Sequence, residues 1–182
     1  MLMIVTINTE QDIVEVNGVI VYQRNTTTVR NPAIIADMFA EHRGDKEYTG
    51  VVKTIQEWYY GRLLETAWCA TAMSYFANQA GYLAAIGGKN ENVYNMLQAC
   101  KNSGCGVVYE KGNIPSTILK GDILFWLWSG DTMTSGSSKH VNIAEYDSIN
   151  GGNIFAIGGN QKDKICTLEY TRDNLYAVYR MR

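Results

Sequence analysis

The order of hydrophobic periods along the chain constrains its fold more than any other feature. From residue 33 to residue 102, apolar residues recur at the three- and four-residue spacing of amphipathic helices, whereas after residue 120 they form short runs typical of strands. Helices that precede a set of strands predict an α+β fold in which the helices pack on an antiparallel sheet of about five to six strands. The strand-like runs are GDILFWLW, HVNIAEYD, GNIFAIGGN, ICTLEYT and LYAVYRMR.

The first 45 residues form a candidate extension. Residues 12–23 place Asn17-Gly18 between two β-branched runs, which predicts a β-hairpin. Asn31-Pro32 then fits the start of a helix that ends at Gly44. We therefore expect an N-terminal extension over residues 1–45, made of a hairpin and a helix, and a main domain over residues 46–182.

The helical part of the main domain has recognisable starts and stops. A helix over residues 51–60 is stopped by Gly61, and a short helix is expected over residues 94–102. Between them, Thr66 is a suitable N-cap and Gly81 a suitable C-terminal residue for a helix that includes Cys69.

Composition excludes several classes of protein. The 182 residues are 46% hydrophobic and 19% charged, as in an ordinary globular protein with a sizeable core. A net charge of −2 without a run of Lys and Arg argues against nucleic acid as a partner. No apolar run is long enough for a membrane span, so we expect no membrane insertion, and the start of the chain does not resemble a signal peptide.

The cysteines and histidines do not form a metal-binding pattern. Cys100 and Cys105 could close a small disulfide loop or supply two ligands, but a single pair at this spacing is more typical of ordinary thiols. His42 and His140 are the only imidazoles in the chain. We expect no metal and no cofactor.

Cys69 is the candidate nucleophile. In the first turn of a helix, a thiol lies beside free backbone N–H groups and the positive end of the helix dipole, which favour the thiolate. The same N–H groups could stabilise an oxyanion. Because the helix also carries Ala72, Met73 and Phe76, the alternative is that Cys69 is a core residue.

Two downstream residues could complete the chemistry that a thiol nucleophile needs. His140 opens the strand-like run HVNIAEYD, where an imidazole at a sheet end can meet a helix terminus. Asn160 ends the next run and, at a period of two, shares a face with Gly158. Its amide could therefore lie beside the histidine and orient the ring.

Together these stretches resemble the CHAP domains, the cysteine- and histidine-dependent amidohydrolases/peptidases of the NlpC-like branch of papain-type enzymes. The likeness rests on WCATAMSYFANQAG, GDILFW, HVNIAEY and IGGN, in this order, and covers roughly residues 50–180. It implies a papain-like fold in which Cys69 is the nucleophile, His140 the general base and later acid, and Asn160 the residue that orients the imidazole.

The chain departs from the family at one position. Gly158 stands where many CHAP proteins carry an acidic residue two positions before the asparagine. This leaves Asn160 as a papain-like third member, with Glu145 and Asp163 as nearby alternatives of less favourable placement.

The resemblance implies hydrolysis of an amide bond of bacterial peptidoglycan, by a stem-peptide endopeptidase or an N-acetylmuramoyl-L-alanine amidase. Trp68, Trp126 and Trp128 are candidates for the walls of a substrate groove, and core packing is the alternative for each. We expect a protein made in the cytoplasm that reaches the wall by lysis, a virion or a secretion machine, with a virion, secretion-system or immunity-protein partner. A non-catalytic wall-binding or virion structural domain and a papain-like acyltransferase stay open as other functions.

Overall fold

The structure of the protein is a computed structural model that describes residues 5–8, 13–16, 19–23, 31–128, 132–137 and 139–182. The chain divides into two compact units, residues 1–30 and residues 31–182. The candidate extension therefore stops at residue 30, where residue 45 was expected.

The N-terminal unit is a three-stranded antiparallel sheet. Its strands are β1 (Val5–Asn8), β2 (Ile13–Val16) and β3 (Val19–Gln23), in the order β1-β2-β3. Val16 pairs with Val19, which confirms the predicted hairpin between β2 and β3. Its two turn residues, at positions 17 and 18, lie outside the described residues.

The main unit is an α+β fold, as the order of hydrophobic periods predicts. Its helices are α1 (Ala33–Glu41), α2 (Gly50–Tyr60), α3 (Cys69–Gln79) and α4 (Val93–Asn102). Its strands are β4 (Gly106–Glu110), β5 (Ile123–Leu127), β6 (Lys139–Ala144), β7 (Ile154–Gly158), β8 (Cys166–Tyr170) and β9 (Leu175–Met181). They form one antiparallel sheet in the order β4-β9-β5-β6-β7-β8. Each predicted run contains one strand, and β4 is an additional edge strand.

The helices begin and end near the residues that the sequence predicts, except for the start of α3, the helix that carries Cys69. The Asn31 side chain accepts a hydrogen bond from the Ala33 amide at 3.2 Å, and Gly61 ends α2 with a left-handed φ of 71°. Gly81 also has a positive φ, of 77°, just after α3. However, α3 begins at Cys69, so Thr66 is not its N-cap and Cys69 is its first residue.

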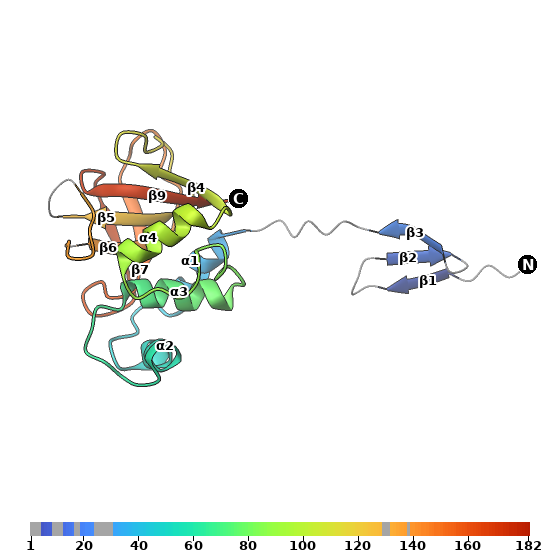
Figure 1. Ribbon diagram of the computed structural model, residues 1–182, viewed down its shortest axis with the longest axis horizontal. Coiled ribbons are helices and arrows are strands. Elements are labelled where there is room, and N and C mark those ends of the chain that lie inside the picture. The colour runs from blue at the N-terminus through green and yellow to red at the C-terminus, as the bar shows by residue number, and fades with distance from the viewer. Residues whose placement is uncertain (1–4, 9–12, 17–18, 24–30, 129–131, 138) are drawn as a thin grey trace, which may run out of the picture. The chain divides into compact units, whose positions relative to one another are not determined.

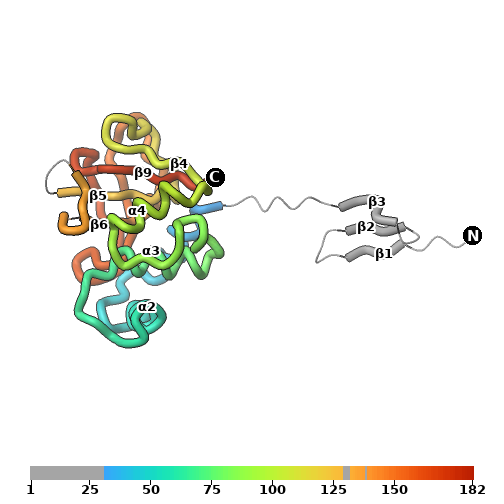
Figure 2. The backbone as a smooth tube through the Cα atoms, in the orientation of Figure 1, coloured from blue at the N-terminus to red at the C-terminus, as the bar shows by residue number. Residues whose placement is uncertain are grey.

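Helices α1, α3 and α4 pack on one face of the sheet (Figure 1). Phe125 of β5 and Val141 of β6 share a buried core with Phe39 of α1 and Phe76 of α3, whose rings lie 4.2 Å apart. Helix α1 contacts α3, β6 and β7, which makes it part of the main unit. Helix α2 packs on α3, as the tube of Figure 2 also shows.

The opposite face of the sheet has its own smaller core. Alternate residues of β5, Leu124 and Trp126, are fully buried there. They pack with Ile118 and Ile114, which belong to the segment between β4 and β5. This segment covers the sheet face without adding a helix.

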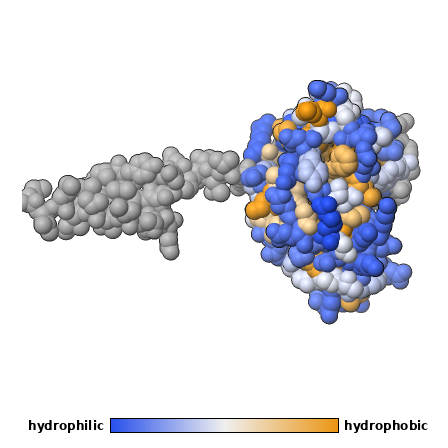
Figure 3. Space-filling view, turned by 180° about the vertical axis from the view of Figure 1, so that it is seen from behind, coloured by the Kyte–Doolittle hydropathy of each residue, from blue (hydrophilic) through white to orange (hydrophobic). Residues whose placement is uncertain are grey.

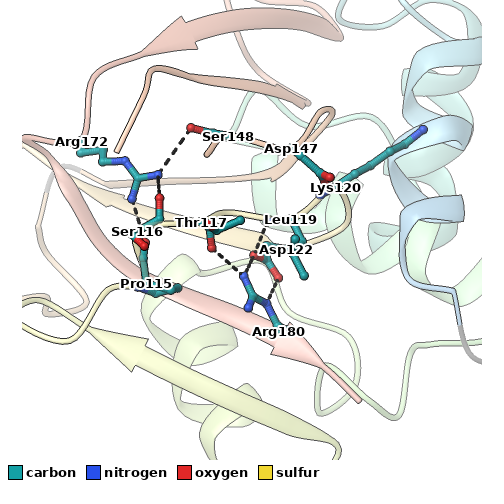
Figure 4. Close-up of polar contacts among 10 residues, drawn as sticks. All are labelled: Pro115, Ser116, Thr117, Leu119, Lys120, Asp122, Asp147, Ser148, Arg172 and Arg180. Atoms are coloured by element: carbon teal, nitrogen blue, oxygen red, sulfur yellow. Dashed lines mark hydrogen bonds and ion pairs between the residues drawn. The ribbon is translucent and has the colours of Figure 1, made fainter. Parts of the chain in front are cut away.

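Two arginines fasten that segment to the sheet (Figure 4). The Arg172 guanidinium donates to the carbonyl oxygens of Pro115 and Ser116 at 2.8 and 2.9 Å. Arg180 donates to the buried Asp122 carboxylate at 2.9 and 2.6 Å and to the Thr117 carbonyl at 2.9 Å. Asp122 thus anchors the start of β5.

The surface of the main unit is mixed. Seen from behind in Figure 3, hydrophilic side chains predominate and apolar areas are interspersed among them. Large exposed apolar side chains include Ile149 and Tyr146, at the turn after β6. In the described part of the chain, no helix combines the length and the apolar character that crossing a bilayer requires.

The buried Asp122–Arg180 ion pair should contribute more to the free energy of unfolding than the exposed Asp37–Lys120 pair. Asp122→Ala removes the charged partner of Arg180 and the acceptor of the Leu119 amide, so we expect a loss of roughly 3 kcal/mol of unfolding free energy. Asp37→Ala removes the exposed pair with Lys120 and should cost about 0.5 kcal/mol or less. Urea denaturation measures both, and equal losses would contradict the anchoring role of Asp122.

Candidate active site

Cys69 occupies the first position of α3, where backbone N–H groups lack helical partners. Its side chain is only 5% exposed. Burial raises the pKa of the Cys69 thiol, whereas N–H groups of Val141, Ala70 and Cys69 itself, together with the charge of Lys139, act in the opposite direction. The thiol therefore lies against the backbone of β6, one residue after His140.

His140 is the second residue of β6 and pairs with Trp126 of β5. Cys69 and His140 line one surface cleft of about 390 Å³. The cleft brings together residues from α3, β6 and the connection between β7 and β8. The structure thus places both residues in the same cleft, and their catalytic roles stay a prediction.

The side chain that contacts the imidazole is Gln161. His140 Nε2 lies 3.2 Å from Gln161 Oε1. The orientation of this amide is fixed from its other end, because Gln161 Nε2 donates to the carbonyl oxygens of Cys166 and Ala156. With the amide oxygen facing the ring, Nε2 of the imidazole carries the hydrogen and Nδ1 is left as the acceptor.

Gln161 Oε1 is also held by two further donors. Asn142 Nδ2 donates to it at 2.9 Å and the Tyr170 hydroxyl at 2.6 Å. Asn142 in turn accepts from Trp126 Nε1 at 2.7 Å, and the Trp126 ring stacks on Tyr170 with centroids 4.4 Å apart. The imidazole is thus supported by a buried polar network that spans four strands.

The hydrogen bond predicted for Asn160 is made by its neighbour. Strand β7 ends at Gly158, so the alternation that placed Asn160 on the histidine side stops two residues too early. Asn160 has a left-handed φ of 58° and belongs to a turn. It lines the cleft, but the described hydrogen bonds include none between its side chain and His140. The sequence did contain a second candidate for this hydrogen bond, the glutamine directly after Asn160. Strand alternation, however, placed its side chain on the opposite face of the sheet.

Gly158 and Gly159, which precede this turn, lie too close to neighbouring residues to carry a side chain. A Cβ on Gly158 would lie 2.7 Å from the Asn142 Cβ, and one on Gly159 would lie 2.5 Å from the Trp68 ring. Gly158 therefore cannot be replaced by the acidic residue common in CHAP proteins without displacing Asn142. Gly159 lets the connection that carries Gln161 approach the start of α3.

The three tryptophans differ in their surroundings. Trp68 and Trp126 are fully buried, so the expectation that they line a groove is wrong. Trp68 packs against Gly159, and Trp126 belongs to the polar network. Trp128 is 46% exposed and lines the cleft, with its ring centroid 6.3 Å from that of His140. Only this tryptophan of the three has the placement of a substrate-contacting residue.

The alternative acidic residues do not reach the imidazole. Glu145 is buried and accepts hydrogen bonds from Arg43 and Thr167. It is therefore a buried residue whose carboxylate is already paired. Asp163 is exposed, has a φ of 57° and accepts a backbone bond from Glu47 through its carbonyl.

The resting state of the site is electrically neutral at its two central groups. Burial lowers the pKa of His140 to about 4, and the bond to Gln161 offsets only part of this effect. Among the described residues no hydrogen bond joins the Cys69 thiol to the imidazole. The structure thus presents a neutral thiol and a neutral base in one cleft.

The remaining cysteines are free thiols that do not line the cleft. Cys100 and Cys105 are not joined by a disulfide, and burial raises the pKa of Cys100 to about 12. Cys166 donates its S–H to the Gln161 carbonyl at 3.1 Å. Within the described part of the chain, no three His, Cys, Asp or Glu side chains form a group that could hold a metal ion.

Comparison with known proteins gives no relative. Neither a protein-family model, nor a curated protein, nor a solved structure matches this chain.

The His140 environment predicts an unusual NMR titration. We expect the ring to carry its hydrogen on Nε2 at neutral pH and to protonate with an apparent pKa near 4. Because the unfolded chain takes up this proton near pH 6.5, stability should fall as pH falls from 6.5 toward 4. Imidazole ¹⁵N shifts, recorded on a His42→Gln variant that leaves one histidine, measure both properties. Titration at 6.5 or above would contradict the burial argument.

Proposed function

We propose that this protein is a cysteine-dependent hydrolase of amide bonds in bacterial peptidoglycan, with a papain-like, CHAP-like main domain. One observation carries the chemical part of the proposal: a thiol at a helix start and an imidazole with a fixed tautomer line the same cleft. The substrate class comes from the resemblance of the sequence around Cys69 and His140 to CHAP domains.

The chemistry begins with two neutral groups. His140 Nδ1 takes the proton of the Cys69 thiol, and the sulfur attacks the amide carbonyl carbon. The developing oxyanion is stabilised by backbone N–H groups at the start of α3. The imidazolium then returns its proton to the leaving nitrogen, which departs as an amine. Water, activated by the same imidazole, hydrolyses the thioester and restores the thiol.

Proton transfer requires His140 to come within hydrogen-bond reach of the Cys69 sulfur. Such bonds are often long in the absence of substrate and shorten when substrate binds. The Gln161 bond to Nε2 leaves the ring free to turn about that contact while Nδ1 approaches the sulfur. The network behind Gln161 keeps the tautomer unchanged during this movement.

The burial of Cys69 favours one alternative, a non-catalytic domain that binds the wall or belongs to a virion. A papain-like acyltransferase would use the same residues but pass the acyl group to an amine. The proposed place of action is the cell wall, reached by lysis, a virion or a secretion machine. A virion, secretion-system or immunity protein is the proposed protein partner.

Mass spectrometry of purified peptidoglycan after incubation with the protein tests the function. We expect new amino and carboxyl termini at one bond, absent with Cys69→Ala and retained with the matched Cys105→Ala. Added amines should not appear in the products, as they would with an acyltransferase. EDTA should have no effect. Wild-type digestion by a folded Cys69→Ala protein would exclude the thiol mechanism.

If Gln161 is the residue that orients the imidazole, substitutions of Gln161 and of its neighbour Asn160 should affect activity differently. Gln161→Ala removes the acceptor that fixes the imidazole, so turnover should fall by roughly ten- to a thousandfold. Asn160→Gly keeps the left-handed backbone and should stay within about threefold of wild type. Rates of wall lysis, with circular dichroism to verify folding, measure both. The reverse order would restore Asn160 as the orienting residue.

A further inference from the structure

Cys69 lies where two hollows of the surface meet, and only one of them includes His140. The first is the cleft of about 390 Å³ described above. The second, of about 280 Å³, is lined by Cys69 together with Glu91, Asn92, Ser137 and Lys139, and Lys139 lines both hollows. A substrate held across the sulfur would therefore extend into both hollows.

Proton transfer decides which part of the substrate occupies which hollow. The nitrogen that leaves must receive its proton from His140, so the amine side of the scissile bond lies in the cleft that contains the imidazole. The acyl side stays bound to the Cys69 sulfur and extends into the second hollow. This orientation follows from the proposed function and rests on it.

The charges of the two hollows differ. The charged side chains of the His140 cleft are Lys139 and Lys162, and no carboxylate lines it. Lys139 also lines the second hollow, where the carboxylate of Glu91 offsets its charge. A negative group on the substrate is thus attracted more strongly to the amine side, which has two ammonium groups and no carboxylate, than to the acyl side.

Both lysines are available to a ligand. Lys139 Nζ donates to the carbonyl oxygens of Ser135 and Ser137 at 2.6 and 3.0 Å, which hold the ammonium in place without neutralising it. Lys162 is exposed, and the ion pairs found between described residues include neither lysine. The half-exposed Trp128 ring and Leu168 line the same cleft and supply apolar surface for the carbon skeleton of the ligand.

We propose that the amine released at this site carries a free carboxylate, which Lys139 and Lys162 bind. Within a peptide chain the α-carboxyl group of the amine-side residue is used in the next amide bond. A free carboxylate therefore indicates either the last residue of a stem peptide or a residue with a second carboxyl group. The cleft selects among peptidoglycan amide bonds by this charge.

Soluble muropeptides provide the test. One sample keeps its carboxylates, and a second has them converted to primary amides with carbodiimide and ammonium. We expect wild-type protein to cleave the free-acid sample roughly tenfold faster, with the preference shrinking as salt is raised. Mass spectrometry should find the released amine with its carboxylate attached.

Two lysine variants separate a specific contact from general charge. Lys162→Gln should lower the preference for free acid to about threefold or less, mainly through KM. Lys164→Gln, two residues along the same connection and outside the cleft lining, should keep the full preference. Equal loss in both variants would overturn the assignment to Lys162.

The outcomes also separate this inference from the proposed function. Equal cleavage of free-acid and amidated muropeptides would overturn the carboxylate site and leave the thiol hydrolase in place. Cleavage of neither sample by folded wild-type protein would overturn the proposed function, and the carboxylate site with it.

Discussion

The buried carboxamide of Gln161 holds the candidate site together. Its nitrogen is committed to two backbone carbonyls, so its oxygen must face His140, Asn142 and Tyr170. A buried amide in any other orientation would leave several polar groups without partners, at a cost that a marginally stable domain does not tolerate. The tautomer of the imidazole, the position of Tyr170 and the path of the chain between β7 and β8 all depend on this one group.

Much of the fold could be predicted because its elements are locally encoded. Turn residues and hydrophobic periods marked the hairpin, the helices and five strands of the main sheet, and they placed Cys69 near a helix start and His140 at a strand start, two residues that line one cleft in the structure. The boundary between units was missed since α1 has the period of any amphipathic helix, and only its packing on α3 and β7 shows where it belongs.

The errors within the site arose where tertiary contacts override a local rule. Strand alternation selected Asn160, but β7 ends at Gly158, and the turn that follows brings the next residue, Gln161, to the histidine. Aromatic character suggested groove walls at Trp68 and Trp126, yet both rings fill space beneath the site. The burial of a side chain and the choice of its hydrogen-bond partner depend on how the strands and helices assemble. They therefore cannot be predicted from a short stretch of sequence.

The contact between Gly159 and Trp68 has a mechanical consequence. With no side chain between them, the connection that carries Gln161 rests directly on the residue that precedes Cys69. The connection that carries Gln161 and the start of α3 are therefore in direct van der Waals contact, although Gly159 and Trp68 lie 91 residues apart in the chain. In the proposed mechanism, the His140 ring is therefore the group that moves to bring Nδ1 to the Cys69 sulfur.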